Sequence, residues 1–324
     1  MLWLFGRQAD QNETGKRWKY LSDDLRGARK FIAIEHRPEF LRNPEYRRDF
    51  ESHKADQRIL VRIEPPVVNP WQYMNRVETD FGLVLTEDCL ASKYSWLAGY
   101  FDKESDSRLR HSLESFVWTT RPLDAVAVMA NKFSFQDGEL YSLRRRAWRA
   151  IDQSNVSFCL FGREWDDSIG RTLGKLTVEL GQTIRSGRTP TFAGQLPLRV
   201  PQLGSSRTID TPHSGYQQAR VAVVIENFPN RVTEKLYQAI ESGCRVLYVG
   251  GKASFLKELE PLVHFADPLP DSIMGTLHQM LETDTLQVRR NAQKQAFSLI
   301  GSRDLQMEES MRKLESLISE GAKA

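Results

Sequence analysis

Seven short runs of apolar residues, each bounded by turn-forming residues, recur along the 324-residue chain and restrict the folds open to it. Continuous apolar runs of this length are typical of strands that are buried on both faces of a parallel sheet. The runs cover residues 31–34, 59–63, 82–85, 125–129, 156–160, 222–225 and 246–249.

Helical patterns lie between several of these runs. Residues 139–153 carry apolar side chains at helical spacing, and so do residues 234–242, which are followed by Gly243, a typical residue after a helix C-terminus. The last 50 residues have the same spacing and are expected to form closing helices, one of them with Met307, Met311, Leu314 and Ile318 on one face. Strands that alternate with helices predict an α/β fold with parallel sheets.

The length predicts about two domains of ~150 residues each. Residues 121–124 separate the first three apolar runs from the last four, so we expect an N-terminal domain of residues 1–120 and a C-terminal domain of residues 121–324. Residues 186–214 are rich in Pro, Gly, Ser and Thr, a composition that predicts a long loop.

Composition excludes several classes of protein. Lys and Arg number 45 against 42 Asp and Glu, and this near-balance, with 40% hydrophobic residues, argues against a disordered chain and against bulk attraction to nucleic acid. The three cysteines show no spacing for zinc or for a disulfide framework. No run approaches the ~18 apolar residues of a membrane span. A reduced, cytoplasmic protein is therefore expected.

The stretch from Val221 to Gly251 carries the most chemical information. A strand is followed by a loop at residues 226–231, and a helix then begins near Thr233. Helix N-termini beyond the carboxyl ends of parallel strands favour phosphate binding. Lys235 in the first helical turn is unfavourable next to the helix dipole unless an anion binds there, and Glu234 beside it can accept hydrogen bonds from sugar hydroxyls.

This stretch resembles the donor-binding motif of the family 10 glycosyltransferases, the α-1,3/1,4-fucosyltransferases. The family pattern is F-E-N, then Y-[ITV]-[TS]-E-K-L, then A-G-x-x-P-[VI]. It is matched here by Glu226-Asn227, by Thr233-Glu234-Lys235-Leu236 and by Gly243. Residues 128–146, 156–162 and 62–66 resemble three further family segments in the same order, so the resemblance covers about residues 58–255.

The resemblance implies a GT-B architecture, in which two Rossmann-like domains face each other across a cleft. It also implies an inverting transfer of L-fucose from GDP-fucose to a hydroxyl of an acceptor glycan, without a metal or another cofactor. The chain contains no D-x-D motif, which agrees with that expectation. The expected partners are the nucleotide-sugar donor and a glycan or lipid-linked saccharide, with no nucleic acid and at most peripheral contact with the inner face of the membrane.

The resemblance also assigns roles to residues. Glu64 matches the general base, Arg144 and Lys235 match ligands of the donor phosphates, and Glu234 matches a ligand of hydroxyl groups. Further candidates for the donor site are Glu226, Asn227, Asn131 and Arg231.

Some residues depart from the family pattern and leave alternatives open. Arg231 stands where the family usually has an aromatic residue, and Arg245-Val246 replaces the usual x-Pro. One alternative is a glycosyltransferase that uses a different nucleotide sugar. Another is a non-catalytic protein that binds nucleotides or glycans. Binding of nucleic acid through residues 144–146 and Arg47-Arg48 is the least favoured alternative, because the net charge is only +3.

Overall fold

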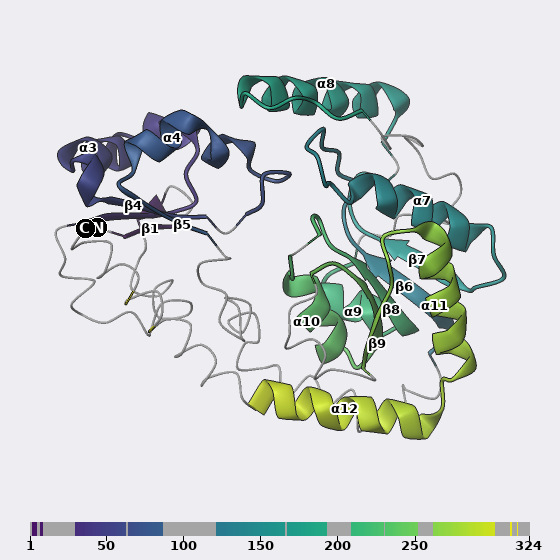
Figure 1. Ribbon diagram of the computed structural model, residues 1–324. Helices are drawn as coiled ribbons and strands as arrows, with labels where there is room; N and C mark the ends of the chain where they lie inside the picture. Colours follow the sequence, from purple (N-terminus) through teal and green to yellow (C-terminus); the bar gives the residue numbers. More distant parts are fainter. Residues whose placement is uncertain are drawn as a thin grey trace. The chain divides into compact units, whose positions relative to one another are not determined.

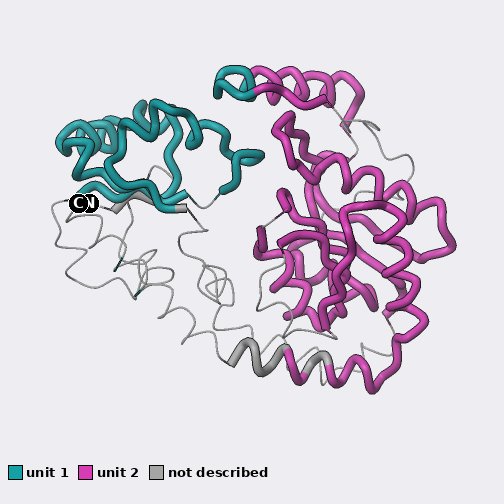
Figure 2. The backbone as a smooth tube through the Cα atoms, viewed as in Figure 1, with its two compact units in different colours: residues 1–99, 182–188, 303–324 teal, residues 100–181, 189–302 magenta. Residues whose placement is uncertain are grey.

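Two separate five-stranded sheets form the framework of the protein in the computed structural model (Figure 1). The chain divides into two compact units (Figure 2). The first unit comprises Met1–Gly99, Gln182–Arg188 and Arg303–Ala324, and the second comprises Tyr100–Gly181 and Thr189–Ser302. The structure describes residues 2–4, 7–8, 30–62, 64–86, 121–165, 167–192, 209–229, 231–251, 262–301, 312 and 316.

The sheet of the first unit has the strand order β2-β1-β3-β4-β5. All neighbouring strands are parallel except β1 and β2, which are antiparallel. Phe31 on β3 packs edge-to-face against Tyr46 and Phe50, so an aromatic cluster joins a helix to the sheet. The elements are β1 (Leu2–Leu4), β2 (Arg7–Gln8), β3 (Phe31–Ile34), η1 (Pro38–Arg42), α3 (Pro44–Ser52), η2 (Ala55–Gln57), β4 (Arg58–Arg62), η3 (Pro70–Tyr73), α4 (Asn75–Asp80) and β5 (Leu83–Thr86).

The sheet of the second unit is parallel throughout and has the strand order β10-β9-β8-β6-β7. From β6 the chain first moves outward to β7 and then returns to the other side of β6 with β8. The elements are β6 (Leu123–Val128), α7 (Tyr141–Asp152), β7 (Phe158–Phe161), α8 (Ile169–Arg185), α9 (Pro212–Tyr216), β8 (Ala219–Ile225), α10 (Glu234–Glu241), β9 (Arg245–Val249), β10 (Val263–Phe265), α11 (Pro270–Glu282) and α12 (Leu286–Gly301).

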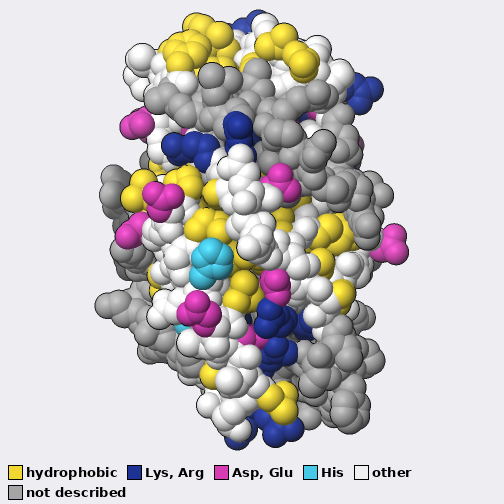
Figure 3. All heavy atoms as spheres, turned by 90° about the vertical axis from the view of Figure 1, so that its right-hand side faces the viewer, with side chains coloured by type: hydrophobic (Ala, Val, Ile, Leu, Met, Phe, Trp, Pro, Cys, Tyr) yellow, Lys and Arg dark blue, Asp and Glu magenta, His cyan; other side chains and the backbone are white. Residues whose placement is uncertain are grey.

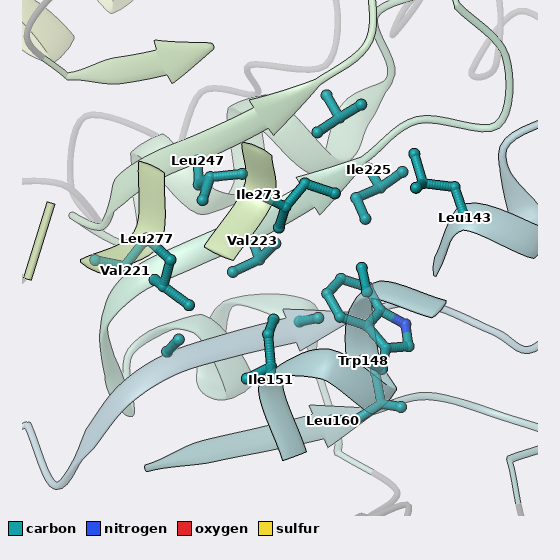
Figure 4. Packing of buried hydrophobic residues seen from close by; sticks show 14 of the residues in the cluster. Leu143, Trp148, Ile151, Leu160, Val221, Val223, Ile225, Leu247, Ile273 and Leu277 are labelled. Carbon is teal, nitrogen blue, oxygen red and sulfur yellow. The ribbon is translucent and has the colours of Figure 1, made fainter. Parts of the chain in front are cut away.

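Strand β8 is buried on both faces, as its continuous apolar run predicts. Val221, Val223 and Ile225 lie in one cluster with side chains of α7 and α11 (Figure 4). Trp148 of α7 is fully buried in this cluster. The alternate residues of β8 point to the opposite face, so both layers of helices are held by one strand.

The expected fold class is confirmed: the protein is α/β, with two Rossmann-like units. The seven predicted strands are confirmed as β3 to β9, and the two predicted helices as α7 and α10. Gly243 follows α10 with a φ of +75°, the left-handed conformation expected after a helix end. The predicted domain boundary between residues 120 and 121 lies at the end of residues 87–120, which are outside the described residues, so it stays a prediction.

The predicted loop over residues 186–214 is wrong at its C-terminal end, where α9 begins at Pro212. Thr211 caps this helix by accepting a hydrogen bond from the amide of Ser214 at 3.3 Å. A proline in the first turn after a capping threonine favours a helix, and a prediction from composition alone missed that signal. Residues 193–208 of the predicted loop lie outside the described residues.

The predicted closing helices are confirmed in part. Helices α11 and α12 cover residues 270–282 and 286–301, whereas Met307, Met311, Leu314 and Ile318 lie outside the described residues. Helix α8 was not predicted, and it exposes much of its apolar stripe: Ile169 and Leu173 are 58% and 50% exposed. Figure 3 shows hydrophobic side chains gathered on the surface over α8.

Candidate functional site

The strand order of the second unit creates a switch point between β6 and β8. The chain leaves these two neighbouring strands toward opposite sides of the sheet, and ligands of α/β proteins bind beyond the carboxyl ends of such strands. Asn131 follows β6, and Glu226 and Asn227 follow β8. Every predicted donor residue lies in the second unit, either after one of these strands or at the start of a following helix.

Glu226 organises the loop that leads from β8 to α10. Its carboxylate is fully buried and accepts hydrogen bonds from the amide of Thr233 at 2.8 Å and from the hydroxyl of Thr233 at 2.7 Å. The hydroxyl of Tyr248 donates a third bond at 3.1 Å. Burial raises the pKa of Glu226, although Lys235 and Thr233 oppose the rise. The buried carboxylate of Glu226 therefore links the start of the loop, directly after β8, to its end at Thr233.

The first turn of α10 carries the ammonium group of Lys235 at the amino end of the helix. The hydroxyl of Thr233, the N-cap residue, is bonded to Glu226 and makes no capping bond to the helix. Lys235 donates to this hydroxyl at 3.2 Å and to the carboxylate of Glu234 at 3.0 Å. Burial acts to raise the pKa of Glu234, but the charge of Lys235 outweighs it and lowers this pKa. The turn thus presents a positive helix end and a lysine together.

Arg144 lies beneath the same loop. Its guanidinium group donates two hydrogen bonds to the carbonyl of Ile225, at 3.0 and 2.7 Å, and one to Oδ1 of Asn227 at 2.7 Å. Burial lowers the pKa of Arg144, while Tyr141 and Glu226 counteract this shift. Because the side chain is only 2% exposed, its observed contacts hold the end of β8 and orient Asn227.

The loops after β6 and β8 also meet directly. The amide of Leu140 donates to the carbonyl of Asn227 at 3.1 Å. Gly138 has a φ of +77°, and a Cβ atom there would come within 2.8 Å of the ring of Phe228. A side chain at position 138 would therefore push the two loops apart.

Asn131 ties the loop after β6 to the loop after β7. Its amide donates to the carbonyl of Arg163 at 3.0 Å, and its side-chain nitrogen donates to the carbonyl of Glu164 at 3.3 Å. The Oδ1 atom of Asn131 is buried and has no hydrogen-bond partner among the residues that the structure describes. Asn131 thus lies beyond the carboxyl end of β6, and its role in donor binding stays a prediction.

Arg231 closes the other side of the loop through its backbone. Its carbonyl accepts hydrogen bonds from the hydroxyl of Tyr248 at 2.7 Å and from the amide of Gly251 at 3.1 Å. At Gly250, a Cβ atom would lie 2.5 Å from the side chain of Glu226, so a larger residue would displace this carboxylate. The residue at position 231 departs from the family pattern, but its backbone carbonyl still bonds the loop to Tyr248 and Gly251.

Glu64 lies in the first unit, just beyond the carboxyl end of β4, and is half-buried. Its amide donates to the carboxylate of Glu35 at 2.7 Å, and its carbonyl accepts from the hydroxyl of Tyr73 at 3.0 Å. Glu35, which follows β3 directly, is 1% exposed and has a φ of +63°. The side-chain amides of Asn69 and Gln72 also donate to it.

The sequence prediction did not include Glu35, whose buried carboxylate holds the backbone amide of Glu64. The available signal was its position directly after an apolar run, whereas Glu64 was identified through the family resemblance.

Among the described residues, no group of three or more His, Cys, Asp or Glu side chains is placed to hold a metal ion. Within the same residues, no helix is long and apolar enough to cross a membrane. The expectations of metal-independent chemistry and of a cytoplasmic location stay predictions.

No protein-family model matches the sequence, and no curated protein matches it. A UDP-forming α,α-trehalose-phosphate synthase from Burkholderia xenovorans, in complex with glucose-6-phosphate, has 12% identity and a TM-score of 0.48, over 95% of this chain and 79% of that chain. The corresponding synthase from Burkholderia vietnamiensis has 11% identity and a TM-score of 0.43, over 90% and 69% of the two chains.

A glycosyltransferase from Rickettsia africae has 10% identity and a TM-score of 0.36, over 98% of this chain and 76% of that chain. Because all three TM-scores are below 0.5, these likenesses carry no argument about this protein.

Proposed function

We propose that this protein is a glycosyltransferase that uses a nucleotide-sugar donor, and that this donor is GDP-fucose. The observation that carries the proposal is the first turn of α10 at the switch point, where Thr233 is bonded to the buried carboxylate of Glu226 and accepts a hydrogen bond from the ammonium group of Lys235. A positive helix end with a lysine suits the diphosphate of a nucleotide sugar. The resemblance of the same residues to the fucosyltransferase motif supports GDP-fucose in particular.

The proposed reaction is a single displacement. The hydroxyl oxygen of the acceptor attacks the anomeric carbon of fucose from the side opposite GDP, and the bond to the GDP oxygen breaks as the new bond forms, so the configuration inverts. Glu64 accepts the hydroxyl proton as general base. Lys235 and the first amides of α10 stabilise the negative charge on the departing diphosphate. In this proposal the reaction needs no metal ion or other cofactor.

The remaining residues of the proposed donor site divide by burial. The resemblance makes Arg144 a ligand of the donor phosphates; because Arg144 is buried and bonded to Ile225 and Asn227, we propose instead that it positions the loop after β8, as the buried Glu226 does. Asn227, Asn131 and Arg231 lie on the connecting loops and are proposed to line the donor site. Glu234 is proposed to bind sugar hydroxyls. One oxygen of its carboxylate accepts a hydrogen bond from Lys235, and the other oxygen is proposed to accept from the sugar.

The proposed acceptor is a glycan or a lipid-linked saccharide. Its proton must reach Glu64, whose backbone is held on two sides by Glu35 and Tyr73. A cytoplasmic location is part of the proposal, and a lipid-linked acceptor would add peripheral contact with the inner face of the membrane.

One observation favours a second candidate, a glycosyltransferase for a different nucleotide sugar. The fucosyltransferase pattern has an aromatic residue at the position of Arg231, and that aromatic residue is expected near the nucleotide. A guanidinium group there would offer hydrogen bonds and charge instead of a stacking surface.

Donor profiling tests the proposal. The protein is incubated with GDP-fucose, other GDP sugars, UDP sugars and CMP sugars, each in water and with pooled acceptor glycans, and the released nucleotide is measured with and without EDTA. Release of GDP from GDP-fucose, undiminished by EDTA, is the expected result. Release from a UDP or CMP sugar alone would transfer the proposal to the second candidate. Tight nucleotide binding without release from any donor would contradict an enzyme.

A further inference from the structure

Lys132 is an exposed lysine on the loop that follows β6. No carboxylate among the described residues lies within ion-pair distance of its ammonium group. It stands beside Asn131, at the carboxyl edge of the strand that forms one side of the switch point. The sequence prediction gave this lysine no role.

Buried groups hold the backbone of Lys132 in place. Arg145 is fully buried, donates to the carbonyl of Lys132 at 2.8 Å and lies over the ring of Phe133 at 4.2 Å from its centroid. The amide of Lys132 donates to the carbonyl of Ala130 at 3.1 Å. With Asn131 anchored to the loop after β7, the side chain of Lys132 therefore starts from a backbone that is fixed on both sides.

The ammonium group of Lys132 lies within electrostatic range of two other elements. Its charge contributes to lowering the pKa of Glu234 in the first turn of α10, where Lys235 has the larger effect, and it opposes the rise in the pKa of Glu179 that burial causes on α8. Lys132 thus lies on the loop at the β6 side of the switch point, and Lys235 lies in the first turn of the helix that follows β8, the neighbouring parallel strand.

The positive charge at the start of α10 is smaller than the negative charge of a diphosphate. The ammonium group of Lys235 is already partly neutralised by Glu234 at 3.0 Å. A diphosphate carries two to three negative charges, so one lysine and a helix end of about half a charge do not balance it. A further cation on the opposite side of the switch point would complete the balance.

We propose that Lys132 is a second cationic ligand of a diphosphate group, which binds between Lys132 on the β6 loop and Lys235 on α10. The identity of the diphosphate as part of a nucleotide sugar rests on the proposed function. The binding of a diphosphate at this edge of the sheet does not, because it follows from the two lysines and the strand order.

The experiment measures the affinity for GDP, UDP and inorganic pyrophosphate by calorimetry on the full chain. Lys132→Ala is expected to weaken binding about 10-fold, the usual effect of losing one charge-assisted contact, whereas Lys132→Arg should stay within about 3-fold of the wild type. Lys294→Ala is the matched control, because Lys294 is an exposed lysine on α12. It should bind like the wild type.

The outcomes test the role of Lys132 independently of the proposed function. Equal binding by the wild type and Lys132→Ala overturns the role of Lys132, and so does a wild type that binds none of the three probes. The role is also overturned if Lys132→Arg loses as much affinity as Lys132→Ala. Arginine keeps the positive charge, so such a loss would not depend on the charge. Lysine-dependent binding by a protein that releases nucleotide from no sugar donor supports the diphosphate site and overturns the proposed function.

Discussion

Glu226 is a carboxylate whose burial has a direct consequence for stability. It receives three hydrogen bonds, yet burial raises its pKa above the ordinary value of 4.5. The folded state therefore binds a proton at Glu226 more tightly than the unfolded state does. The resulting stabilisation is fully present below the unfolded pKa and is lost as the pH rises through the folded-state pKa.

The variant Glu226→Gln tests this sign, because glutamine does not titrate. The free energy of unfolding of the wild type, minus that of the variant, should fall as the pH rises from about 4.5 through the raised pKa, and should then level off. Urea unfolding of both proteins at a series of pH values measures this difference. A difference that grows with pH would contradict the raised pKa.

Single residues also show where sequence reasoning succeeds and where it stops. Lys235 and Glu234 were predicted from a short motif, and the structure places them together in the first turn of α10. The burial of Arg144 was not foreseen, because three consecutive arginines are an unusual source of core residues. Arg144 and Arg145 are buried, whereas Arg146 is exposed. Glu35 was missed because its contacts come from residues about 30 positions away.

At the scale of elements, a network of charges joins α12 and the turn before it to the amino ends of β8 and β9. The carboxylate of Asp284, in the turn between α11 and α12, has no exposed side-chain surface and contacts Arg220, Arg245 and Arg289. Arg220 also pairs with Asp124 on β6. This network lies at the edge of the sheet opposite to the candidate site, so it belongs to the framework.

Removing the charge of Asp284 should destabilise the second unit strongly. Asp284→Asn leaves three arginines around a neutral group, and breaking a buried charge pair costs about 3–5 kcal/mol. Urea unfolding measures the loss. Asp152→Asn, at an exposed position on α7, is the control and should change the free energy of unfolding by less than about 0.5 kcal/mol. Similar values for the two variants would contradict a framework role for the network.

Local periodicity predicted elements well where the apolar pattern matched burial. Helix α7 was predicted because its apolar face is its buried face. Helix α8 was missed for the opposite reason, since it buries Thr172 and Thr183 and exposes Ile169 and Leu173, and three glycines interrupt its pattern. Strand β10 has only three residues, too few for a recognisable pattern.

At the scale of the whole molecule, the α/β class followed from the alternation of elements, but the strand order did not. The switch point depends on the pairing of β6 with β8, in which Ala125 is the partner of Val221. These residues are almost a hundred positions apart, and no local pattern encodes their contact. The carboxyl edge of the sheet could thus be predicted as the site, whereas the choice of the two strands that flank it required the structure.

The division into two units predicts that base and donor functions can be separated by mutation. Glu64→Gln keeps the size of the side chain but removes the proton acceptor, so transfer should fall by about 10²- to 10⁴-fold while the affinity for GDP stays unchanged. Lys235→Ala should weaken GDP binding about 10- to 100-fold, because it removes a charge-assisted contact at the helix end. Transfer rates and calorimetry on the same preparations measure both quantities.

Glu78→Gln is the matched control for the first unit, because Glu78 is an exposed carboxylate on α4 that pairs with Arg62 at 3.4 Å. It should leave both the transfer rate and GDP affinity near the wild-type values. If Glu64→Gln transfers sugar at the wild-type rate, another group accepts the proton. If it loses GDP binding as well, Glu64 is needed for the structure of the donor site, and the separation of functions between the units fails.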